Sequence, residues 1–437
     1  MRVLLVQPSR LQKDGTVYKN RTRWLLGMTL PYVAALTPPG IDVAIKDDLY
    51  EEVTFDEPCD VVGLTCMSHQ ASRAYQIADE FRRRGKKVVI GGFHATLAPE
   101  EALQHADAVV IGEAEGVWPQ LLEDAASNRL QPIYRSATLS DMKGLPIPRY
   151  DLIDLRRYRI PNLPAQTTRG CPYACSYCEV TQVYGARFRY RPPEEVIEEV
   201  KALMTLGRRK FVYFVDDIFN AHRKHAFAVM EGLKGLKVHW TCLCTANVGD
   251  DGEMLDLMRA SGCLHINIGM ESISPESLKA VNKKQNHADR YKEQFAAIRK
   301  RGIEFSLNVM FGLDGDTLAT FDATVQKLIE YKAPLSFMFI LSPRVGLKIR
   351  DELAEQGRIV HSDWDRYHSY ECVFEPKHMT RSELEEGFWR AQRQFYSLGS
   401  IARRLFLPPN RHTLQSLLPN LFFRWGVNRG IHPLTYY

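Results

Sequence analysis

Short apolar runs typical of buried strands alternate with amphipathic helical stretches along most of this chain. Helical patterns at Leu30–Leu36 and Ala71–Arg84 separate the first of these runs. Strands that alternate with helices form parallel sheets with helices on both faces. A doubly wound parallel α/β domain is therefore expected over residues 1–140. Its strand candidates are Arg2–Gln7, Ile41–Lys46, Asp60–Cys66, Lys87–Ile90 and Ala108–Ile111.

A second alternation begins at Pro164, after a proline-rich stretch that we interpret as an ordered linker over residues 141–163. Helical patterns occur at Pro192–Leu206 and Arg290–Arg301. The strand candidates are Gln166–Arg169, Lys210–Val215, His239–Cys244, His265–Met270, Glu304–Met310 and Leu335–Leu341. These six units are fewer than the eight of a closed TIM barrel, so a partial (β/α)6 TIM-like barrel with one open side is expected over residues 164–345. The patterns in residues 346–437 are mainly helical.

Small and polar residues follow the strand candidates of the first domain. They occupy Pro8–Ser9, Thr65–Ser68, Gly91–His94 and Gly112–Glu115. The carboxyl ends of parallel strands lie at one edge of a sheet, and ligands of open α/β sheets bind there. The sequence G-x-G-x-x-G is absent, which disfavours a nicotinamide dinucleotide at this rim.

The composition excludes several classes of protein. Lys and Arg number 57 and Asp and Glu 52, and a net charge of +5 does not support binding of nucleic acid by charge alone. Nine unevenly spaced cysteines make a disulfide framework unsuitable. The first nine residues hold only a short apolar run without a cleavage-type segment, and no apolar stretch of about 18 residues occurs. We therefore expect a reducing, cytoplasmic location.

The run Arg169-Gly-Cys-Pro-Tyr-Ala-Cys-Ser-Tyr-Cys178 places Cys171, Cys175 and Cys178 at positions i, i+4 and i+7. Three thiolates this close can wrap one metal centre. Zinc usually takes four ligands, and no further Cys or His lies near in sequence, whereas a four-iron four-sulfur cluster with one open iron suits three. Tyr177 is placed to shield such a cluster. The alternatives are chance proximity or a zinc knuckle completed from afar, but the position at the end of the first barrel strand favours the cluster.

These residues resemble the radical S-adenosylmethionine (SAM) superfamily, whose C-x-x-x-C-x-aromatic-C loop they match. The resemblance continues through Phe214–Phe219, Ile268–Ser272 and Phe311–Thr317 and covers most of residues 164–345. It implies that the open iron chelates the amino and carboxylate groups of SAM, and that an electron then splits the sulfonium to give a deoxyadenosyl radical. An electron donor such as flavodoxin or ferredoxin is implied as a partner.

Five polar residues in this region are candidates for contact with SAM. Asp216 and Asp217 are placed to accept a hydrogen bond from the SAM ammonium or to orient a substrate, and the alternative is that they cap the next helix. Glu271 and Ser272 present the same choice between the SAM ribose and a cap. Asn308 is a polar residue in an apolar strand, which indicates the barrel interior and either SAM or a neighbouring backbone group.

The first 140 residues resemble the cobalamin-binding domain that precedes the radical domain in one branch of this superfamily, through Leu64–Gln70, Gly91–Thr96 and Ile111–Glu115. The D-x-H-x-x-G motif that supplies a cobalt-ligating histidine elsewhere is absent, so that ligation is not expected. Alternatives are a tight turn for the two glycines at 91 and 92, a helix cap for the histidine at 94 and a solvated loop carboxylate for the glutamate at 113. The candidate cobalamin contacts are Thr65, Met67, Ser68, Gly91, Gly92, His94, Gly112 and Glu113.

Residues 387–437 contain seven Arg, many aromatic residues and no Asp, Glu or Lys. Ordinary core packing with a solvated basic face is one interpretation of this composition. The others are a pocket for an apolar or anionic substrate and a peripheral contact with a membrane surface.

Taken with the family resemblance, these patterns imply a cobalamin-dependent radical SAM C-methyltransferase that acts on an unactivated carbon of a small-molecule or lipid-like substrate. One SAM would give the radical, methylcobalamin would deliver the methyl group, and a second SAM would restore it. The alternatives are a non-methylating member that performs a cyclisation, ring rearrangement or hydroxylation, and a corrinoid or electron carrier or cobalamin sensor. Nucleic acid is not expected as a partner, and the sequence does not identify the substrate.

Overall fold

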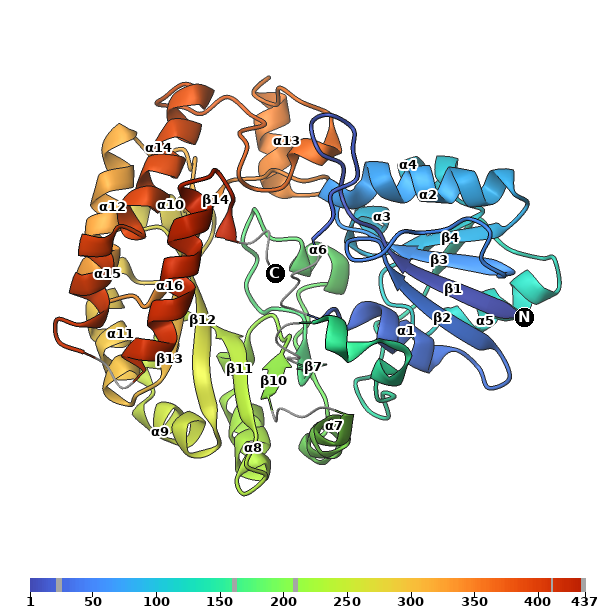
Figure 1. Cartoon of the computed structure of the whole chain (residues 1–437), viewed down its shortest axis with the longest axis horizontal. Helices are drawn as coiled ribbons and strands as arrows, with labels where there is room; N and C mark the ends of the chain where they lie inside the picture. The colour runs from blue at the N-terminus through green and yellow to red at the C-terminus, as the bar shows by residue number, and fades with distance from the viewer. Residues whose placement is uncertain (21–25, 159–162, 207–210, 410–411, 434–437) are drawn as a thin grey trace.

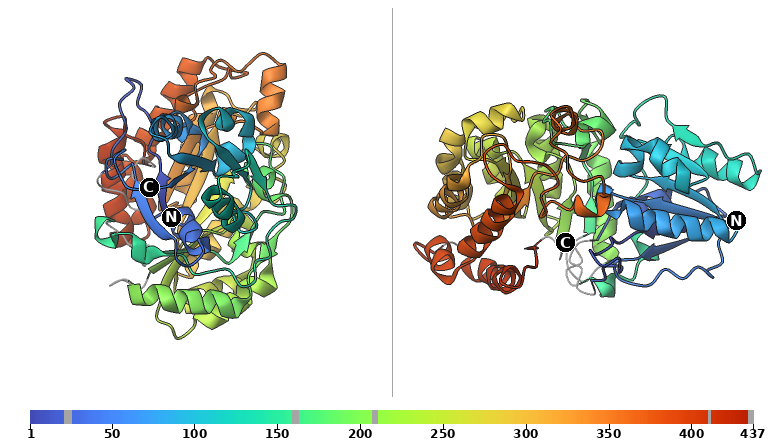
Figure 2. Two further views of the ribbon diagram at one scale, coloured as in Figure 1. Left: turned by 90° about the vertical axis from the view of Figure 1, so that its right-hand side faces the viewer. Right: turned by 90° about the horizontal axis from the view of Figure 1, so that it is seen from above.

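The structure, a computed structural model, describes residues 1–20, 26–158, 163–206, 211–409 and 412–433. Two six-stranded parallel sheets form its framework (Figure 1). The blue N-terminal sheet lies beside the green and yellow barrel, and the red C-terminal helices lie on the opposite side of the barrel (Figures 1 and 2). The described residues include no helix both long and apolar enough to cross a membrane.

The first sheet has the order β2-β1-β3-β4-β5-β6, and all its neighbouring strands run parallel. Its bounds are β1 Arg2–Gln7, β2 Asp42–Asp47, β3 Val61–Thr65, β4 Lys87–Gly91, β5 Ala108–Ile111 and β6 Ile133–Arg135. Helices cover both faces, so the central strands are buried on both sides and read as continuous apolar runs. The expected doubly wound architecture is confirmed, and the short edge strand β6 is an addition to it.

The helices of this region divide between the two faces of the sheet. One apolar cluster joins one face to α1 (Thr29–Leu36) and α5 (Trp118–Ala126). A second cluster joins the other face to α2 (Ala71–Arg83), α3 (Phe93–Leu97) and α4 (Pro99–His105). The turn between β4 and α3 and the loop after β5 both lie at the carboxyl edge of this sheet.

The second sheet has the order β14-β13-β12-β11-β10-β7, and among the described strands it does not close on itself. Its bounds are β7 Leu163–Ala165, β10 Phe211–Phe214, β11 His239–Cys244, β12 Cys263–Glu271, β13 Glu304–Phe311 and β14 Leu335–Ile340. The expected partial barrel is confirmed. Lys210, where the second strand was predicted to begin, lies outside the described residues.

The position predicted for the first barrel strand, Gln166–Arg169, is wrong. The barrel strand is β7, which pairs with β10. Thr168–Arg169 instead forms β8, which pairs antiparallel with β9 (Arg189–Tyr190). The chain turns away from the barrel because the Asp216 carboxylate accepts hydrogen bonds from the backbone N–H groups of Thr167 and Thr168.

Helices surround the outside of the barrel. The predicted Pro192–Leu206 and Arg290–Arg301 correspond to α7 and α11. The surrounding helices are α7 Pro193–Leu206, α8 Arg223–Leu233, α9 Gly252–Ala260, α10 Pro275–Ala280, α11 Tyr291–Lys300 and α12 Leu318–Glu330. The short helix α6 (Val180–Tyr184) lies instead between the barrel and the N-terminal sheet, where it contacts α3 (Figure 1). The described part of the proline-rich stretch is ordered by contacts with both sides: Arg149 N–H donates to the Pro31 carbonyl, and the Tyr150 hydroxyl donates to the Pro164 carbonyl. Residues 159–162, including Pro161, lie outside the described residues.

The C-terminal region adds the helices α13 (Lys348–Glu355), α14 (Arg381–Phe395), α15 (Leu398–Leu405) and α16 (Thr413–Val427). Phe388, Phe395, Tyr396 and Phe423 are buried in the same apolar cluster as the barrel. The Tyr396 hydroxyl donates to the Ser336 carbonyl of β14 at 2.7 Å. For these aromatic residues the packing interpretation is confirmed, so the tail is part of the barrel core.

One arginine of this tail is fully buried between the C-terminal helices and the barrel. The Arg404 guanidinium makes five hydrogen bonds and lies 3.7 Å from the centre of the Phe395 ring. No carboxylate is among these partners, and burial lowers the pKa of Arg404 to about 9. The acceptors are the carbonyls of Ala333, Pro334 and Phe395, the Ser400 hydroxyl and the Asn420 side-chain oxygen.

Replacing Arg404 by Met should lower the free energy of unfolding by about 3 kcal/mol or more, because several buried acceptors lose their donor. Urea unfolding followed by circular dichroism measures this change. The exposed neighbour Arg403 on the same helix is the matched control, and Arg403→Met should change stability by no more than about 0.5 kcal/mol. Equal stability of the two variants would contradict a structural role for Arg404.

Candidate functional site

The carboxyl edges of the two sheets meet at a cavity of about 290 Å³. The first sheet contributes five predicted residues that reach this cavity with backbone or side chain: Thr65, Met67, Gly91, Gly92 and Gly112. Glu113 also lines it. The barrel side contributes Gln166, Arg169, Val183 and Tyr184. Sequence reasoning thus found one wall of the cavity and missed the other.

The turn after β4 shows why a glycine is required in this wall. Gly92 has a φ of 92°, and a Cβ added there would lie 2.5 Å from the Thr65 hydroxyl oxygen and 2.9 Å from the Cys66 nitrogen. The backbone after β4 therefore packs directly against the end of β3. This is the tight turn considered from the sequence, and it also leaves a wall without projecting side chains for a large flat ligand.

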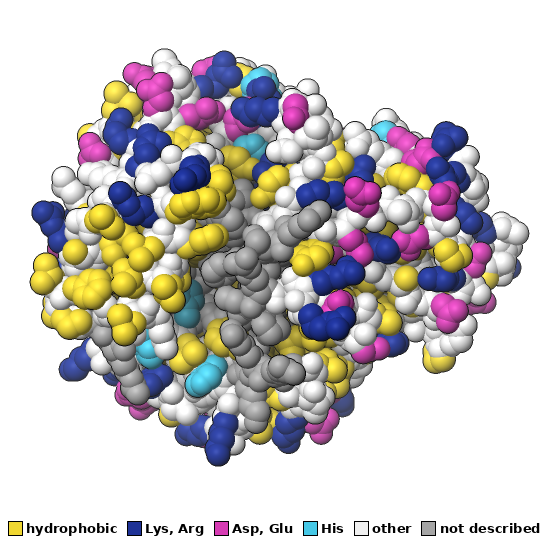
Figure 3. Space-filling view, viewed as in Figure 1, with side chains coloured by type: hydrophobic (Ala, Val, Ile, Leu, Met, Phe, Trp, Pro, Cys, Tyr) yellow, Lys and Arg dark blue, Asp and Glu magenta, His cyan; other side chains and the backbone are white. Residues whose placement is uncertain are grey.

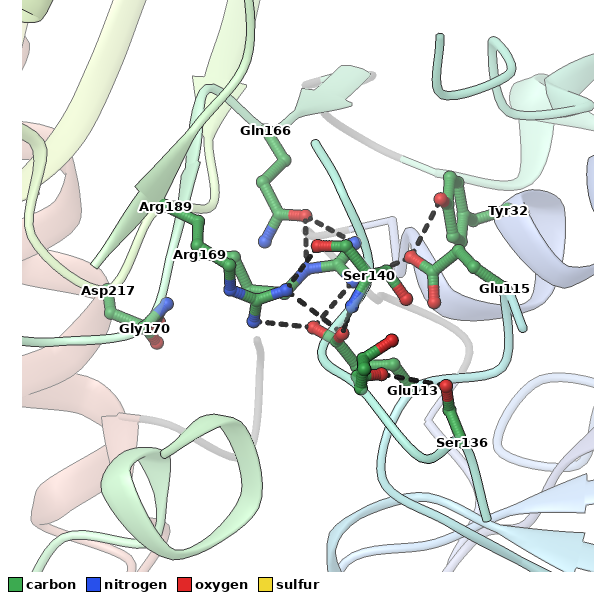
Figure 4. A network of polar contacts seen from close by, with 11 residues as sticks. Tyr32, Glu113, Glu115, Ser136, Ser140, Gln166, Arg169, Gly170, Arg189 and Asp217 are labelled. Atoms are coloured by element: carbon green, nitrogen blue, oxygen red, sulfur yellow. Dashed lines mark hydrogen bonds and ion pairs between the residues drawn. The ribbon is translucent and has the colours of Figure 1, made fainter. Parts of the chain in front are cut away.

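A network of buried charges joins the two walls (Figure 4). Arg169 donates to Glu113 at 2.9 Å and to Glu115 at 2.6 Å, and Arg189 donates to Glu113 at 2.9 and 2.7 Å. Glu115 also accepts from the Tyr32 hydroxyl at 2.8 Å. These contacts tie the loop after β5 to strands β8 and β9.

Strand pairing explains why the two arginines need these carboxylates. Arg169 and Arg189 are direct partners in the β8–β9 pair, and like charges at such positions repel each other. Burial alone would raise the pKa of Glu113, but the hydrogen bond from Arg189 and the charge of Arg169 lower it to about 2. The prediction of a solvated loop carboxylate is therefore wrong, because Glu113 is buried and charged between two guanidinium groups.

Ser68 and His94 are not among the residues that line the cavity. Both are fully buried, and the His94 Nδ1 lies 3.2 Å from the Ser68 hydroxyl. The His94 Nε2 lies 3.1 Å from the Tyr75 hydroxyl and 3.4 Å from a Glu101 oxygen. These contacts correct the expectation for both side chains, since they bond to each other and to the protein behind the wall. The helix-cap alternative for His94 is not observed either.

The cysteine loop follows β8 at the other side of the site. Cys171 and Cys175 are buried and Cys178 is half-buried, and burial raises the pKa of the Cys171 thiol to about 11 and of the Cys178 thiol to about 12. Within the described residues, no three Cys, His, Asp or Glu side chains converge as a site for a single metal ion. A cluster with its irons at separate corners does not need sulfurs that converge on one point, so the loop fits a cluster better than a zinc knuckle.

A buried lysine stands beside this loop. Lys283 donates to the Glu271 carboxylate at 3.0 Å, and its ammonium lies 5.9 Å from the centre of the Tyr177 ring. Burial would lower the pKa of Lys283, but the charge of Glu271 raises it. The structure thus joins the two predicted residues, Tyr177 and Glu271, through a cation that sequence reasoning missed.

Asp216 and Asp217 hold the backbone that leads into the cysteine loop. Asp216 accepts from Thr167 and Thr168, and Asp217 accepts from the Gly170 N–H at 3.0 Å. Burial raises the pKa of each carboxyl to about 6. The predicted helix cap is wrong for both, because the side chain of His222 caps α8.

The remaining predicted residues lie at the end of β12 and within β13. Ser272 accepts from the Ser274 N–H at 3.1 Å, and Ser274 itself caps α10 (Pro275–Ala280), so the cap interpretation of Glu271 and Ser272 is wrong. Asn308 lies in β13, and its buried side-chain oxygen has no hydrogen-bond partner within the described structure. Gln285, whose amide nitrogen lies 3.9 Å from the Cys175 sulfur, also has an unpartnered buried oxygen. Such atoms fit a site that receives a polar ligand.

The functional residues that sequence reasoning missed are mostly charged partners of residues it found. Arg169 had a signal, because it directly precedes the Gly-Cys of the loop. Glu115 was included in the rim without a role. Lys283, Gln285 and Arg189 stand apart from any motif, and only the fold brings them to the site.

Comparisons with known proteins agree with this arrangement. The model of the radical SAM superfamily matches residues 165–328, and the model of the B12 binding domain matches residues 33–122. The bacteriochlorophyllide d C-12(1)-methyltransferase of Chlorobaculum tepidum is 31% identical over 426 residues, which cover 92% of each chain. The anaerobic magnesium-protoporphyrin IX monomethyl ester cyclase of Cereibacter sphaeroides is 26% identical, covering 90% of this chain and 69% of that protein.

A solved structure shares the fold of nearly the whole chain. The cobalamin-dependent S-adenosylmethionine radical enzyme OxsB, with aqua-cobalamin and S-adenosylmethionine bound, matches with a TM-score of 0.74 and 14% identity, covering 98% of this chain and 72% of that chain. The two family models and the solved structures support the cofactors expected from the sequence, which are a four-iron four-sulfur cluster, SAM and cobalamin. Through its two domains and its similarity to a relative over nearly its full length, the chain belongs to the cobalamin-dependent radical SAM enzymes.

Proposed function

We propose that this enzyme is a C-methyltransferase that holds cobalamin and SAM on opposite sides of one small-molecule substrate. The observation that carries the proposal is the position of Arg169, which lines the cavity of the first sheet and lies two residues before Cys171. A single short segment therefore touches both cofactor sites. Proximity of two reactive centres to one substrate supplies a large part of such a rate.

On the cobalamin side, the flat wall formed by Thr65, Met67, Gly91, Gly92 and Gly112 contacts the corrin in this proposal. Glu113 acts through Arg169 and Arg189, whose positions it fixes, and it does not need to contact the cofactor.

On the SAM side, Cys171, Cys175 and Cys178 hold the cluster. When bound, the cluster and SAM supply an organic radical, and cobalamin supplies a methyl group. The chain positions these groups: Asp217 fixes the backbone of Gly170, Lys283 fixes Glu271, and Asn308 offers an unpartnered oxygen to the ligand. Asp216 supports the same segment from behind and is a positioning residue.

Methyl transfer is favoured because the relative that matches 92% of the chain is named a methyltransferase. A second candidate is a non-methylating reaction such as a cyclisation, which the similarity to the cyclase supports over a smaller share of that protein. Both relatives are named for tetrapyrrole substrates, so large planar rings are the first compounds to test.

Replacing Cys171, Cys175 and Cys178 together by Ala should remove the iron bound after anaerobic reconstitution and abolish cleavage of SAM, because the cluster loses its thiolate ligands. Iron content and visible absorbance measure the cluster, and chromatography measures deoxyadenosine. Cys242 and Cys244 provide the matched control, since they are buried on β11, and the double Ala variant should keep its iron. Full iron content in the triple variant would show that the cluster lies elsewhere.

Glu113→Gln should lower the free energy of unfolding by about 3–5 kcal/mol, because the buried Arg169 and the half-buried Arg189 lose a shared carboxylate. The pKa of Glu113 is lowered from 4.5 to about 2, so its contribution is complete above pH 4.5 and is lost as the pH falls through 2. The difference between wild type and variant should therefore shrink over that interval in urea unfolding. The exposed ion pair of Glu253 is the control, and Glu253→Gln should have almost no effect.

The reaction itself can be tested by metabolite analysis of cells with and without the gene. Cells supplied with methyl-deuterated methionine should accumulate a product that carries an intact deuterated methyl group and that is absent from the deletion strain. In the deletion strain, the unmethylated precursor should accumulate instead. A gene-dependent product without the label would support the cyclisation alternative and contradict methyl transfer.

A further inference from the structure

Helix α16 carries exposed leucines and a tryptophan on its outer face, while its inner face combines polar residues with Phe423 and Val427. The residues on its inner face include Thr413, Ser416 and Asn420, all buried. The outer face carries Leu414, Leu418, Leu421 and Trp425, which follow one another at spacings of three or four residues. This spacing places them on one side of the helix. The outer face of this helix is thus more apolar than that of an ordinary surface helix, and its inner face is more polar.

Hydrogen bonds fix this orientation. The Thr413 hydroxyl donates to the Leu405 carbonyl at 2.9 Å, and the Ser416 hydroxyl donates to the Glu304 carboxylate. Asn420 donates to the Pro334 carbonyl at 2.9 Å and accepts from Arg404 at 2.8 Å. A rotation that buried the leucines would leave these polar groups without partners, so the apolar side is held toward the outside.

Neighbouring segments add further exposed leucines to those of α16. Leu414 and Leu418 are 74% and 71% exposed, and Leu398 of α15 and Leu407 of the following loop are 59% and 62% exposed. We call these residues, with Leu421 and Trp425, the apolar face. Figure 3 shows hydrophobic side chains gathered over the part of the molecule that carries α15 and α16. Exposed apolar patches of this kind mark interaction sites.

The surroundings of the apolar face are cationic. Residues 387–437 contain no acidic residue, and Arg403 and Arg429 are exposed on α15 and after α16. The Arg429 guanidinium lies 4.5 Å from the centre of the Trp425 ring. Beside the loop that carries Leu407, Arg299 donates to the Pro408 carbonyl at 2.5 Å.

A lysine adds to this group of cations. Lys332 donates to the Arg403 carbonyl at 2.9 Å. Burial lowers the pKa of Lys332, and the charges of Arg299 and Arg403 lower it further. The cations near Leu407 thus repel one another, and an anion placed among them would relieve this repulsion.

We propose that the apolar face is a docking surface for an anionic lipid bilayer. Exposed leucines and a tryptophan beside arginines match the boundary between acyl chains and negatively charged head groups. A symmetric contact between two copies would bring their cationic borders together without acidic residues of the same segment to compensate them. Charge complementarity therefore favours an anionic membrane over a second copy of the chain.

Flotation of the full-length enzyme with vesicles tests the proposal. Vesicles with about one third phosphatidylglycerol should carry the enzyme to the top of the gradient, while vesicles of phosphatidylcholine alone should carry much less. Sodium chloride at about 1 M should reduce binding, because it shortens the Debye length to about 3 Å. Equal binding to both kinds of vesicle, or binding to neither, would overturn the proposal.

Variants identify the surface. Leu414→Ser with Leu418→Ser should weaken binding about tenfold per leucine, and Arg403→Gln with Arg429→Gln should weaken it only for the anionic vesicles. The matched control is Ile133→Ser with Ile147→Ser, which changes two exposed apolar residues of the N-terminal region and should leave binding unchanged. An equal loss in this control would assign binding to general surface hydrophobicity and overturn the proposal.

Sedimentation velocity without vesicles separates the membrane from a second copy. The wild type and the Leu414→Ser, Leu418→Ser variant should sediment alike, and normal circular dichroism should show that the variant is folded. A wild-type dimer that the double substitution dissociates would instead assign the apolar face to self-association and overturn the proposal.

Discussion

The arrangement of the site depends on two arginines, one buried and one half-buried, that the fold places opposite each other. Strands β8 and β9 bring Arg169 and Arg189 together, and their repulsion has to be balanced by anions. Those anions, Glu113 and Glu115, belong to the loop after β5 of the other sheet. The positive charges of the β8–β9 pair are therefore balanced only when the first sheet is docked against the barrel. The relative position of the two cofactor sites follows from this balance of charge.

A second set of contacts positions the backbone that leads into the cysteine loop. Two adjacent carboxylates after β10 hold successive backbone groups of residues 167–170, immediately before Cys171. A mixture of side-chain and backbone contacts thus connects the wall of the cavity with the first cluster ligand. Ion pairs, strand pairing and hydrogen bonds all position residues 166–170. None of these interactions leaves a recognisable motif in the sequence.

The sequence was sufficient for the architecture because apolar strand runs recur at regular intervals and both sheets are parallel. It also identified the cysteine loop and the glycine-containing wall, since these depend on residues close together in the chain. It misplaced the first barrel strand, because hydrogen bonds from residues 167 and 168 to Asp216 override the local strand propensity. The charged partners Lys283 and Arg189 were not predictable, because only the folded chain brings them beside residues far away in sequence. The buried role of Arg404 was hidden for a related reason: its acceptors are mostly backbone carbonyls, which leave no sequence signal.

The segment of residues 166–170 has a consequence for how the enzyme acquires its cofactors. Its first part lines the cavity and its last part leads into the cluster ligands. A ligand at either end that restricts the motion of this segment reduces the entropy that the other ligand must still remove. Thermodynamic linkage requires this gain to be reciprocal, so each cofactor raises the affinity for the other by the same factor. Cooperative loading of the two cofactors is the expected consequence, with species that carry a single cofactor under-represented at equilibrium.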